Sequence, residues 1–297
     1  MFSGMSAFPL TPLLDDAVDE RAFAGLVQRL AAARVDSITA LGSTGVAAYL
    51  TLEERARVTA LAVEHAQGIP VIAGVSALRT SHVLANVRAA ERAGAQGLLL
   101  APMSYQPLQD GDVFELFRSV LEATNLPVIL YDNPTTTHFT FTDQLYARIA
   151  ELPGLASIKI PGVTRDPDEA LARIQQIRAL VPKHVTIGIS GDAVAVDGLL
   201  AGCDSWYSVV GGTLPELAMQ ITQLSLSGHT GDAHAASERL RPLWDLFAEC
   251  GGSLRVVAAI AEHLGLVAPR CLPLPIQGLS HAQRIRVAEV VADLHLR

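Results

Sequence analysis

The chain has 297 residues and a formal net charge of -8 at pH 7, and half of its residues are hydrophobic while 18% are charged. This composition supplies a large core, and the acidic balance argues against nucleic acid or an anionic membrane surface as a partner. No apolar run reaches the ~18 residues that a membrane span needs, and the opening residues lack the pattern of a signal peptide.

Short apolar runs alternate with alanine-rich amphipathic segments from the start of the chain. Strands are expected at residues 5–8, 35–41, 70–74, 96–101, 127–131, 155–160, 184–190 and 205–209. Helices are expected after the first seven strands, at residues 19–33, 51–67, 80–93, 112–123, 142–150, 166–180 and 193–201. Alternation of this kind predicts a parallel sheet with helical crossovers.

Eight strand-helix units at a spacing of roughly 25 residues favour closure into an α/β fold of the (β/α)8 TIM barrel type. An open doubly wound sheet is the competing arrangement, but it places its ligand at one strand-order reversal. Polar or glycine-rich loops follow several strands here, which suits a barrel mouth better. The expected division is a barrel over residues 1–213 and a C-terminal helical extension over residues 214–297, packed on the barrel.

The C-terminal extension is expected to contain helices but no strands. Its apolar spacing predicts helices at residues 215–226, 232–248, 254–264 and 281–294. The three cysteines of the whole chain, Cys203, Cys250 and Cys271, lie far apart without a CxxC pair. This usage is typical of reduced thiols in a cytoplasmic protein.

The sixth expected strand carries the residue around which the chemistry is predicted. Lys159 lies between two isoleucines near the end of this strand, and the chain has only one other lysine, Lys183. A desolvated lysine can lose its proton and act as a nucleophile, whereas an arginine cannot. The alternative is a structural lysine paired with a buried carboxylate. The position of Lys159 at a strand end favours catalysis, because the active sites of such barrels lie at the carboxyl ends of the strands.

Tyr131 ends the neighbouring strand, at residues 127–131. Adjacent strands lie about 4.8 Å apart, so its phenol can reach the Lys159 amine or a ligand bound to it. A phenol in that position can transfer protons as a general acid and base. The alternative is an aromatic plug at the top of the barrel.

The turn Gly42-Ser43-Thr44-Gly45 follows the second expected strand. Two glycines permit a tight turn, and free N–H groups with two hydroxyls can hold a carboxylate. Gly42, Ser43 and Thr44 are therefore expected to bind substrate, and Thr44 also to take part in catalysis. The signal is weak in isolation, because many turns between strands and helices have this composition.

Further substrate-binding candidates lie after other strands. Asp192 either accepts a hydrogen bond from a substrate hydroxyl or caps the following helix, and Ser190 lies just before it. Thr136 and Tyr207 complete the expected set. The nine histidines show no metal-ligand spacing, and no nucleotide or dinucleotide motif occurs, so neither a metal nor a cofactor is expected.

These segments together resemble the class I aldolase and lyase family that contains dihydrodipicolinate synthase and N-acetylneuraminate lyase. The resemblance runs from FPLTPL through GSTGVAAYLTLEER, PVIAGV, YDNP and SIKIPG to SGD and GLVAPRCLPLP. It implies that Lys159 forms the Schiff base, that Tyr131 transfers protons, and that Ser43 and Thr44 bind the carboxylate of a pyruvate-like 2-oxo acid. It also implies a homotetramer, or a homodimer with the same close contact.

The chain departs from the synthases of this family where a second substrate would bind. Thr136 stands at the place of an arginine that grips a second carboxylate, and Ser104 at the place of a tyrosine that joins a proton relay across a subunit interface. Val46 replaces a glutamate, and Pro161 replaces a threonine or serine. The donor half of the site therefore matches the family, and the acceptor half differs.

Three hypotheses follow. The first is a Schiff-base lyase or aldolase that acts on pyruvate or a related 2-oxo acid by C–C bond cleavage or formation, or by dehydration of a sugar-acid-like substrate. The second is the synthase that condenses pyruvate with aspartate semialdehyde, with another arginine such as Arg79 or Arg165 in the missing role. The third is a barrel that binds a 2-oxo acid without turning it over.

Overall fold

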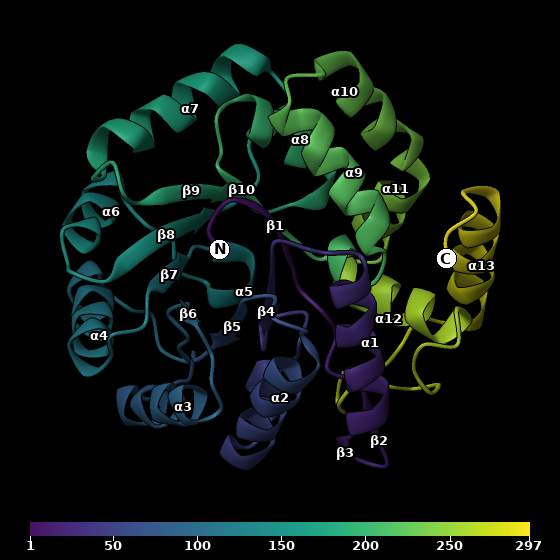
Figure 1. The fold of residues 1–297 in the computed structure, drawn as a ribbon, viewed down its shortest axis with the longest axis horizontal. Helices are drawn as coiled ribbons and strands as arrows, with labels where there is room; N and C mark the ends of the chain where they lie inside the picture. The colour runs from purple at the N-terminus through teal and green to yellow at the C-terminus, as the bar shows by residue number, and fades with distance from the viewer.

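The computed structural model describes residues 1–297, and its centre is a closed barrel of eight parallel strands (Figure 1). The strands follow one another around the barrel in the order β1-β10-β9-β8-β7-β6-β5-β4. Their bounds are β1 Gly4–Ala7, β4 Ser37–Ala40, β5 Val71–Gly74, β6 Gly97–Leu100, β7 Val128–Tyr131, β8 Leu155–Ile160, β9 Thr186–Ile189 and β10 Ser205–Ser208. A small hairpin, β2 Leu13–Leu14 with β3 Ala17–Val18, follows β1. The predicted barrel is confirmed, and the open sheet is excluded because the sheet has no edge.

Helices cover the outside of the barrel, as Figure 1 shows. The crossover helices are α1 Glu20–Ala32, α2 Leu52–His65, α3 Thr80–Arg92, α4 Asp110–Ala123, α6 Asp143–Ala150, α7 Pro167–Leu180 and α8 Ala195–Leu200. Three 3-10 turns, η1 Ala47–Tyr49, η2 Asp192–Val194 and η3 Val210–Gly212, and the short helix α5 Pro134–Thr137 lie in the loops after strands. Helix α2 begins with a capping box, in which Thr51 and Glu54 satisfy each other's backbone N–H groups.

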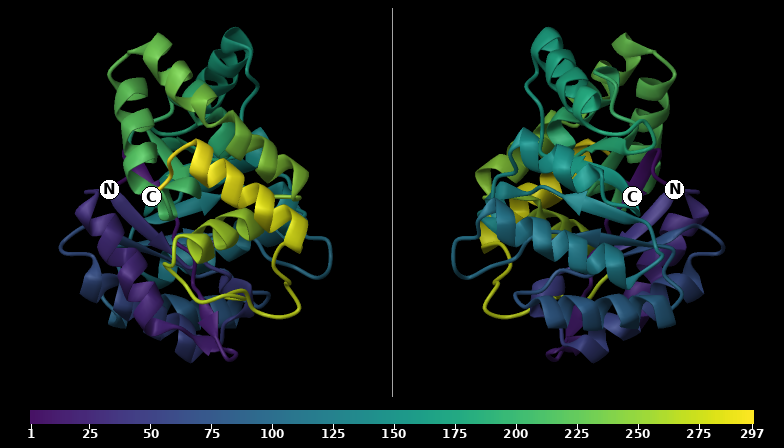
Figure 2. Two further views of the ribbon diagram at one scale, coloured as in Figure 1. Left: turned by 90° about the vertical axis from the view of Figure 1, so that its right-hand side faces the viewer. Right: turned by 90° about the vertical axis from the view of Figure 1, so that its left-hand side faces the viewer.

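The C-terminal helices gather on one side of the barrel (Figure 2). They are α9 Pro215–Leu226, α10 Thr230–Arg239, α11 Arg241–Glu249, α12 Ser253–His263 and α13 His281–Asp293. Helix α9 packs against β1, α8 and η3, so it completes the outer helix layer beside the N-terminal strand. The division of the chain at residues 213 and 214 stays a prediction.

One helix expected at residues 232–248 is two helices, and the single-helix prediction is wrong. Helix α10 ends at Arg239 and α11 begins at Arg241, with Leu240 between them. Pro242 lies in the first turn of α11. Proline has no N–H and disfavours the helical conformation of the residue before it, so an uninterrupted helix cannot run through this position.

The register between β7 and β8 sets which side chains face the barrel interior. Tyr131 lies opposite Lys159 and Ile129 opposite Ser157, after a register shift between Val128 and Ile129. Ile158 and Ile160 pack in the large core between barrel and helices, whereas Ile129 and Tyr131 belong to a separate cluster inside the barrel. Side chains along β8 therefore alternate between the two sides of the barrel wall, with Ser157 and Lys159 facing inward.

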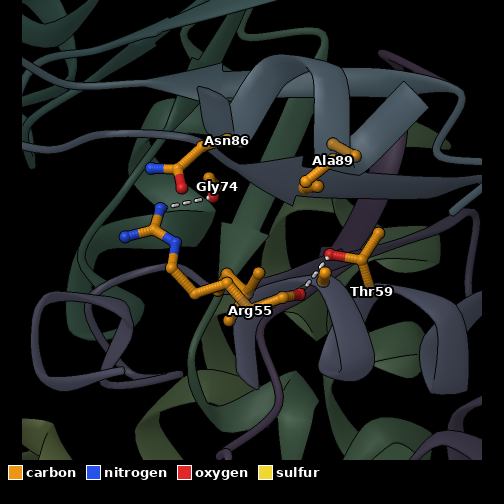
Figure 3. Close-up of a pocket in the computed structure, with 9 residues that line it drawn as sticks. Arg55, Thr59, Gly74, Asn86 and Ala89 are labelled. Carbon is orange, nitrogen blue, oxygen red and sulfur yellow. Dashed lines mark hydrogen bonds between the residues drawn. The ribbon is translucent and has the colours of Figure 1, made fainter. Parts of the chain in front are cut away.

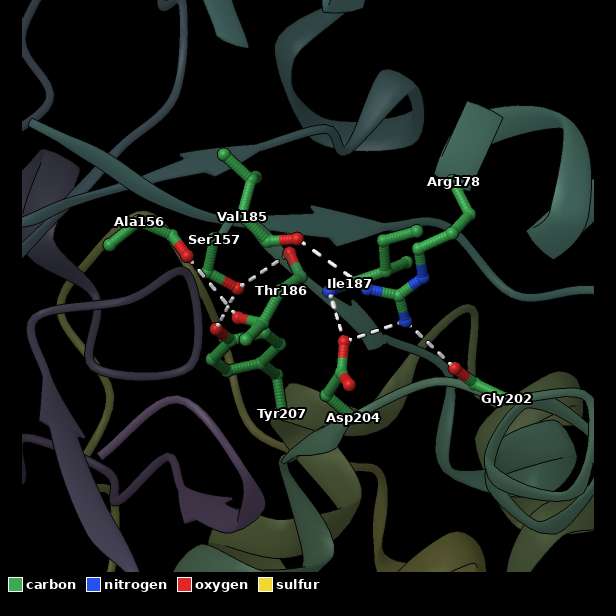
Figure 4. Close-up of polar contacts among 9 residues, drawn as sticks. All are labelled: Ala156, Ser157, Arg178, Val185, Thr186, Ile187, Gly202, Asp204 and Tyr207. Atoms are coloured by element: carbon green, nitrogen blue, oxygen red, sulfur yellow. Dashed lines mark hydrogen bonds and ion pairs between the residues drawn. The ribbon is translucent and has the colours of Figure 1, made fainter. Parts of the chain in front are cut away.

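Polar contacts join the amino-terminal ends of β9 and β10 (Figure 4). Asp204 accepts hydrogen bonds from the Ile187 backbone and from Arg178, which also donates to the carbonyl of Gly202. The three cysteines are free thiols. Among all the helices there is no segment both long and apolar enough to cross a membrane.

Candidate active site

The Lys159 amine lies inside the barrel among three aromatic rings. Its Nζ lies 3.7 Å from the ring centroid of Phe8, 4.1 Å from that of Tyr131 and 5.6 Å from that of Tyr207. Only 2% of the residue is exposed. The amine is therefore removed from water by hydrocarbon and aromatic surface, and no ion pair compensates it at close range.

This burial determines the protonation of the amine. Desolvation lowers the pKa of Lys159 from 10.5 to about 7, and the negative charge of Asp192 opposes this shift. The faces of aromatic rings also attract a cation, so the three rings favour the ammonium form while their bulk excludes water. Because desolvation dominates, much of the amine is neutral near pH 7 and can act as a nucleophile.

Tyr207 reaches the amine because its neighbour on β9 is a glycine. Gly188 lies opposite Lys159 in the register, and a Cβ atom there would lie 2.2 Å from Cε2 of Tyr207. The Tyr207 hydroxyl bonds to Ser157 Oγ over 2.7 Å, on the amino-terminal side of Lys159 (Figure 4). Tyr207 therefore presents a ring face to the amine while its hydroxyl is held by the protein. Substrate contact through that hydroxyl stays a prediction.

The Tyr131 phenol has two polar partners. Its Oη lies 3.3 Å from Ser43 Oγ and accepts a hydrogen bond of 2.7 Å from Asn133 Nδ2. Burial raises the pKa of Tyr131, and the hydrogen bonds with Ser43 and Asn133 oppose that rise. The neutral phenol is therefore the resting form, with two hydrogen-bonding groups already in place beside the oxygen.

The turn after β4 packs closely against the barrel interior. A Cβ atom at Gly42 would lie 2.7 Å from the Phe8 ring, and one at Gly45 would lie 2.9 Å from the Leu41 backbone nitrogen. Both positions therefore require glycine, and the turn lies against the ring that also covers the Lys159 amine. Thr44 is buried, and the Ser43 hydroxyl bonds to the phenol.

A buried arginine connects the segment after this turn to the neighbouring strand, and Figure 3 shows its bond to Gly74. Arg55 on α2 donates to the carbonyl of Ala47 over 3.1 Å and to the carbonyl of Gly74 over 2.9 Å. Its Nε has no partner, and burial lowers the pKa of the guanidinium to about 10. A cavity of about 10 Å³ lies beside it, about the size that one water needs. Arg55 thus ties the segment after the Gly42 turn to strand β5.

Asp192 is buried just after β9, at the start of η2, and its carboxylate is already hydrogen-bonded to other groups of the protein. It accepts hydrogen bonds from the Trp206 indole, the Ser208 hydroxyl and the backbone N–H groups of Val209 and Val210. These bonds fix the end of β10 and the turn η3, and burial raises the pKa of the carboxyl group. Substrate contact through Asp192 stays a prediction, and the four bonds count against it.

The remaining expected residues lie around the mouth of the barrel. The backbone N–H of Ser190 donates to the carbonyl of Ile160, directly after Lys159. Thr136 is exposed on α5, and its hydroxyl accepts a hydrogen bond from Asn133. Asp132, which was not among the expected residues, points away from the barrel interior. Its carboxylate accepts a hydrogen bond from Tyr146 and lines a pocket of about 430 Å³.

The structure thus brings Lys159, Tyr131, Ser43 and Gly42 together around Phe8. It also shows three residues whose contacts the sequence interpretation missed: Phe8, Asn133 and Arg55. The only sequence signal for Asn133 is its place two residues after Tyr131 in the YDNP segment. Phe8 ends the first expected strand, and nothing in its local sequence indicates that its ring reaches the amine.

Comparison with known proteins gives a consistent result along the whole chain. The model of the family described as "Dihydrodipicolinate synthetase family" matches residues 1–294. A curated relative from Hyphomonas neptunium, named 4-hydroxy-tetrahydrodipicolinate synthase, is 34% identical over 302 residues, which cover 99% of this chain and 100% of the relative.

Solved structures agree with this family. A dihydrodipicolinate synthase from Agrobacterium tumefaciens superposes with a TM-score of 0.94 at 43% identity, covering 99% of this chain and 98% of the other. A chloride-inhibited dihydrodipicolinate synthase from Acinetobacter baumannii, complexed with pyruvate, superposes with a TM-score of 0.88 at 25% identity, covering 100% of both chains.

Proposed function

The chain belongs to the dihydrodipicolinate synthetase family of class I lysine-imine enzymes, and from this premise we propose that it acts on pyruvate or a related 2-oxo acid through Lys159. The single observation that carries the assignment of the nucleophile is the buried amine among three aromatic rings, with a pKa lowered to about 7. Family membership counts against the third alternative, a barrel that only binds a 2-oxo acid.

The neutral Lys159 amine attacks C2 of the 2-oxo acid and forms a carbinolamine. Loss of the former carbonyl oxygen as water gives a protonated imine, which draws electrons from the adjacent bonds. Loss of a proton from C3, or cleavage of the C3–C4 bond of a larger substrate, then gives an enamine. Protonation of the enamine, or its addition to an aldehyde, returns the imine, and water releases the product and the free amine.

Tyr131 is proposed to move the protons that these steps require. Its phenol donates to the departing oxygen and takes a proton back in a later step, which is general acid and base catalysis by one group. The Ser43 hydroxyl, 3.3 Å from the phenol oxygen, links this group to the turn that binds the substrate carboxylate. The backbone of Gly42 and the Ser43 and Thr44 groups are proposed to hold that carboxylate, with Thr44 also assisting proton transfer.

The second substrate is proposed to be a polar molecule that bears hydroxyl groups. Thr135 and Thr136 are exposed at the mouth, and Thr136 stands where the synthases carry an arginine for a second carboxylate. Condensation with aspartate semialdehyde is the second candidate, because the curated relatives carry the name of that synthase. Measuring pyruvate release from sugar-derived 2-oxo acids, beside condensation of pyruvate with aspartate semialdehyde, decides between the two.

Assembly as a homotetramer or homodimer is proposed through the loops after β4, β5 and β6. Large apolar side chains are exposed on these three consecutive loops: Tyr49 at 49%, Leu78 at 66% and Tyr105 at 90%. These loops follow neighbouring parallel strands and so lie at the same end of the barrel, and exposed apolar patches are typical of interfaces. Light scattering during size-exclusion chromatography measures the assembly. A cytoplasmic location is proposed from the three free thiols.

The assignment of the nucleophile is tested by reducing the enzyme with borohydride in the presence of pyruvate. Mass spectrometry of the digested protein is expected to find the reduced adduct on Lys159. Lys183, the only other lysine, is exposed and serves as an internal control that stays unmodified. Absence of an adduct on Lys159 with pyruvate and with several other 2-oxo acids would refute the proposal.

A further inference from the structure

The phenol of Tyr131 has partners of two different kinds. The Ser43 hydroxyl can donate or accept, and it lies 3.3 Å away. The Asn133 amide nitrogen can only donate, and it makes the shorter contact of 2.7 Å. The phenol oxygen therefore accepts from Asn133, which leaves the phenol O–H free to donate to Ser43 or to a bound substrate.

The Asn133 amide is itself fixed in place by the short helix α5. Its second N–H donates to Thr136 Oγ1 over 2.8 Å. Its backbone carbonyl accepts from the N–H groups of Thr136 and Thr137 and from the Thr137 hydroxyl. Both N–H groups of the side chain are thus used, and the residue begins a helical turn that starts with Pro134. The donor is oriented before any substrate binds.

A fixed donor beside a phenol acts mainly on the deprotonated state. When Tyr131 gives up its proton, negative charge develops on the oxygen that already accepts from Asn133. Hydrogen bonds to charged groups are stronger than those to neutral ones, and in a buried site a preorganised donor needs no rearrangement. The bond from Asn133 therefore opposes the effect of burial, which raises the pKa of Tyr131.

We propose that Asn133 is a positioning residue for proton transfer, which orients the Tyr131 O–H toward the substrate and stabilises the phenolate after the proton leaves. The inference rests on the proposed role of Tyr131 and goes beyond it. Asn133 supplies a polar partner for the phenol from within the same chain. The resemblance places the family's relay tyrosine across a subunit interface, and this chain has Ser104 at that position. The same amide also bonds to Thr136, and so it connects the phenol to the side of the mouth at which the second substrate is proposed to bind.

Exchange of the C3 hydrogens of pyruvate for deuterium tests this role, because it reports proton transfer on the imine without any second substrate. Asn133→Leu keeps a similar size and removes the donor. We expect the exchange rate at saturating pyruvate to fall by a factor of at least about 10. The pyruvate concentration for half-maximal rate is expected to stay within about twofold, because the carboxylate turn is untouched.

A second variant and a pH profile separate this role from a structural one. Asn133→Asp keeps the shape but places a carboxylate beside the phenol, so it is expected to exchange more slowly still, and its profile is expected to move to higher pH. Asn125→Leu, at an exposed asparagine, is the matched control and is expected to behave as the wild type. Circular dichroism melts show whether each variant is folded.

The outcomes distinguish this inference from the function on which it rests. If Asn133→Leu and Asn133→Asp both exchange pyruvate hydrogens at the wild-type rate with an unchanged pH profile, the role of Asn133 is refuted while the lysine-imine chemistry stands. Borohydride trapping at Lys159 is expected to reach completion in wild type and variants alike. A wild-type enzyme that traps no 2-oxo acid would instead refute the proposed nucleophile.

Discussion

The Lys159 side chain shows how one residue obtains its reactivity from its surroundings. Phe8, Tyr131 and Tyr207 exclude water from the amine, and this desolvation exceeds the opposing attraction of the rings and of Asp192 for a cation. The carboxylate of Asp192 is also engaged in four hydrogen bonds with the protein. A lysine paired directly with a carboxylate would keep its proton, and Lys159 forms no such ion pair.

The first prediction concerns the pH dependence of imine formation. Because only the neutral amine attacks, the initial rate of borohydride trapping with pyruvate is expected to rise about tenfold per pH unit below about pH 7 and to level off above it. Rapid-quench trapping over about pH 5.5 to 9 measures this profile. A rate that keeps rising toward the ordinary lysine pKa of 10.5 would contradict the lowered pKa.

At this scale the sequence predicted that Tyr131 and Lys159 lie close together, which the structure confirms. Strand alternation and the neighbouring position of two strands were sufficient to place Tyr131 beside Lys159. The contribution of Phe8 could not be predicted, because it depends on closure of the barrel between the first and last strands. The direction of the Tyr207 hydroxyl depends on the missing Cβ of Gly188, which alternation alone does not reveal.

Among the elements, the turn after β4 depends on a helix to hold its shape. Arg55 on α2 donates to two backbone carbonyls on different elements, one in η1 and one at the end of β5. No carboxylate pairs with the guanidinium, so its desolvation is offset only by these backbone oxygens. Such an arrangement costs stability unless both bonds are kept, and it makes the position of the turn that is proposed to bind the carboxylate depend on one side chain.

The second prediction is that Arg55→Met weakens binding of the 2-oxo acid. Loss of both bonds frees η1 and the turn, so the pyruvate concentration for half-maximal trapping at Lys159 is expected to rise roughly tenfold, and the free energy of unfolding to fall by about 1–3 kcal/mol. Titration of trapping with pyruvate and urea unfolding measure the two effects.

Arg57→Met is the matched control for this prediction. Arg57 lies on the same helix but is exposed and pairs with Glu20 at the surface, where an ion pair contributes little. Its variant is expected to match the wild type in both measurements. Equal half-saturation for Arg55→Met and Arg57→Met would show that Arg55 does not position the turn.

The elements themselves were largely predictable, since hydrophobic periodicity and capping residues mark most of their ends. The exceptions have local causes. Pro242 divides a helix that the apolar spacing alone makes continuous. The short helix α5 forms from a run of three threonines after Pro134, a composition with low helix propensity, and it is held by the Asn133 carbonyl and the Thr137 hydroxyl. Neither cause appears in a search for periodic apolar residues.

For the whole molecule, the barrel core and the active site make opposing demands at Lys159. The surrounding strands bury this residue as thoroughly as an apolar one, yet the unfolded chain leaves the amine in water and charged. The folded pKa of about 7 lies below the ordinary value of 10.5, so the folded state binds the proton less tightly than the unfolded state. The proposed nucleophile therefore lowers the free energy of unfolding at neutral pH.

The last prediction is that Lys159→Met is more stable than the wild type in a pH-dependent way. Below about pH 7 the lysine is charged in both states, and its full cost of up to roughly 5 kcal/mol opposes folding. Between about pH 7 and 10.5 only the unfolded state holds the proton, so wild-type stability rises by about 1.4 kcal/mol per pH unit. Methionine fills a similar volume and has no charge, so it lacks this dependence.

Urea unfolding of both proteins at about pH 6.5 and about pH 9.5 measures the effect. The stability advantage of Lys159→Met is expected to be largest at the lower pH and to shrink by several kcal/mol at the higher one. Lys183→Met, at the exposed lysine, is expected to show no such narrowing and controls for loss of one positive charge. If the difference in free energy of unfolding between Lys159→Met and the wild type is the same at both pH values, Lys159 keeps an ordinary pKa in the folded protein. The amine would then be charged at neutral pH, which would contradict the proposed neutral nucleophile.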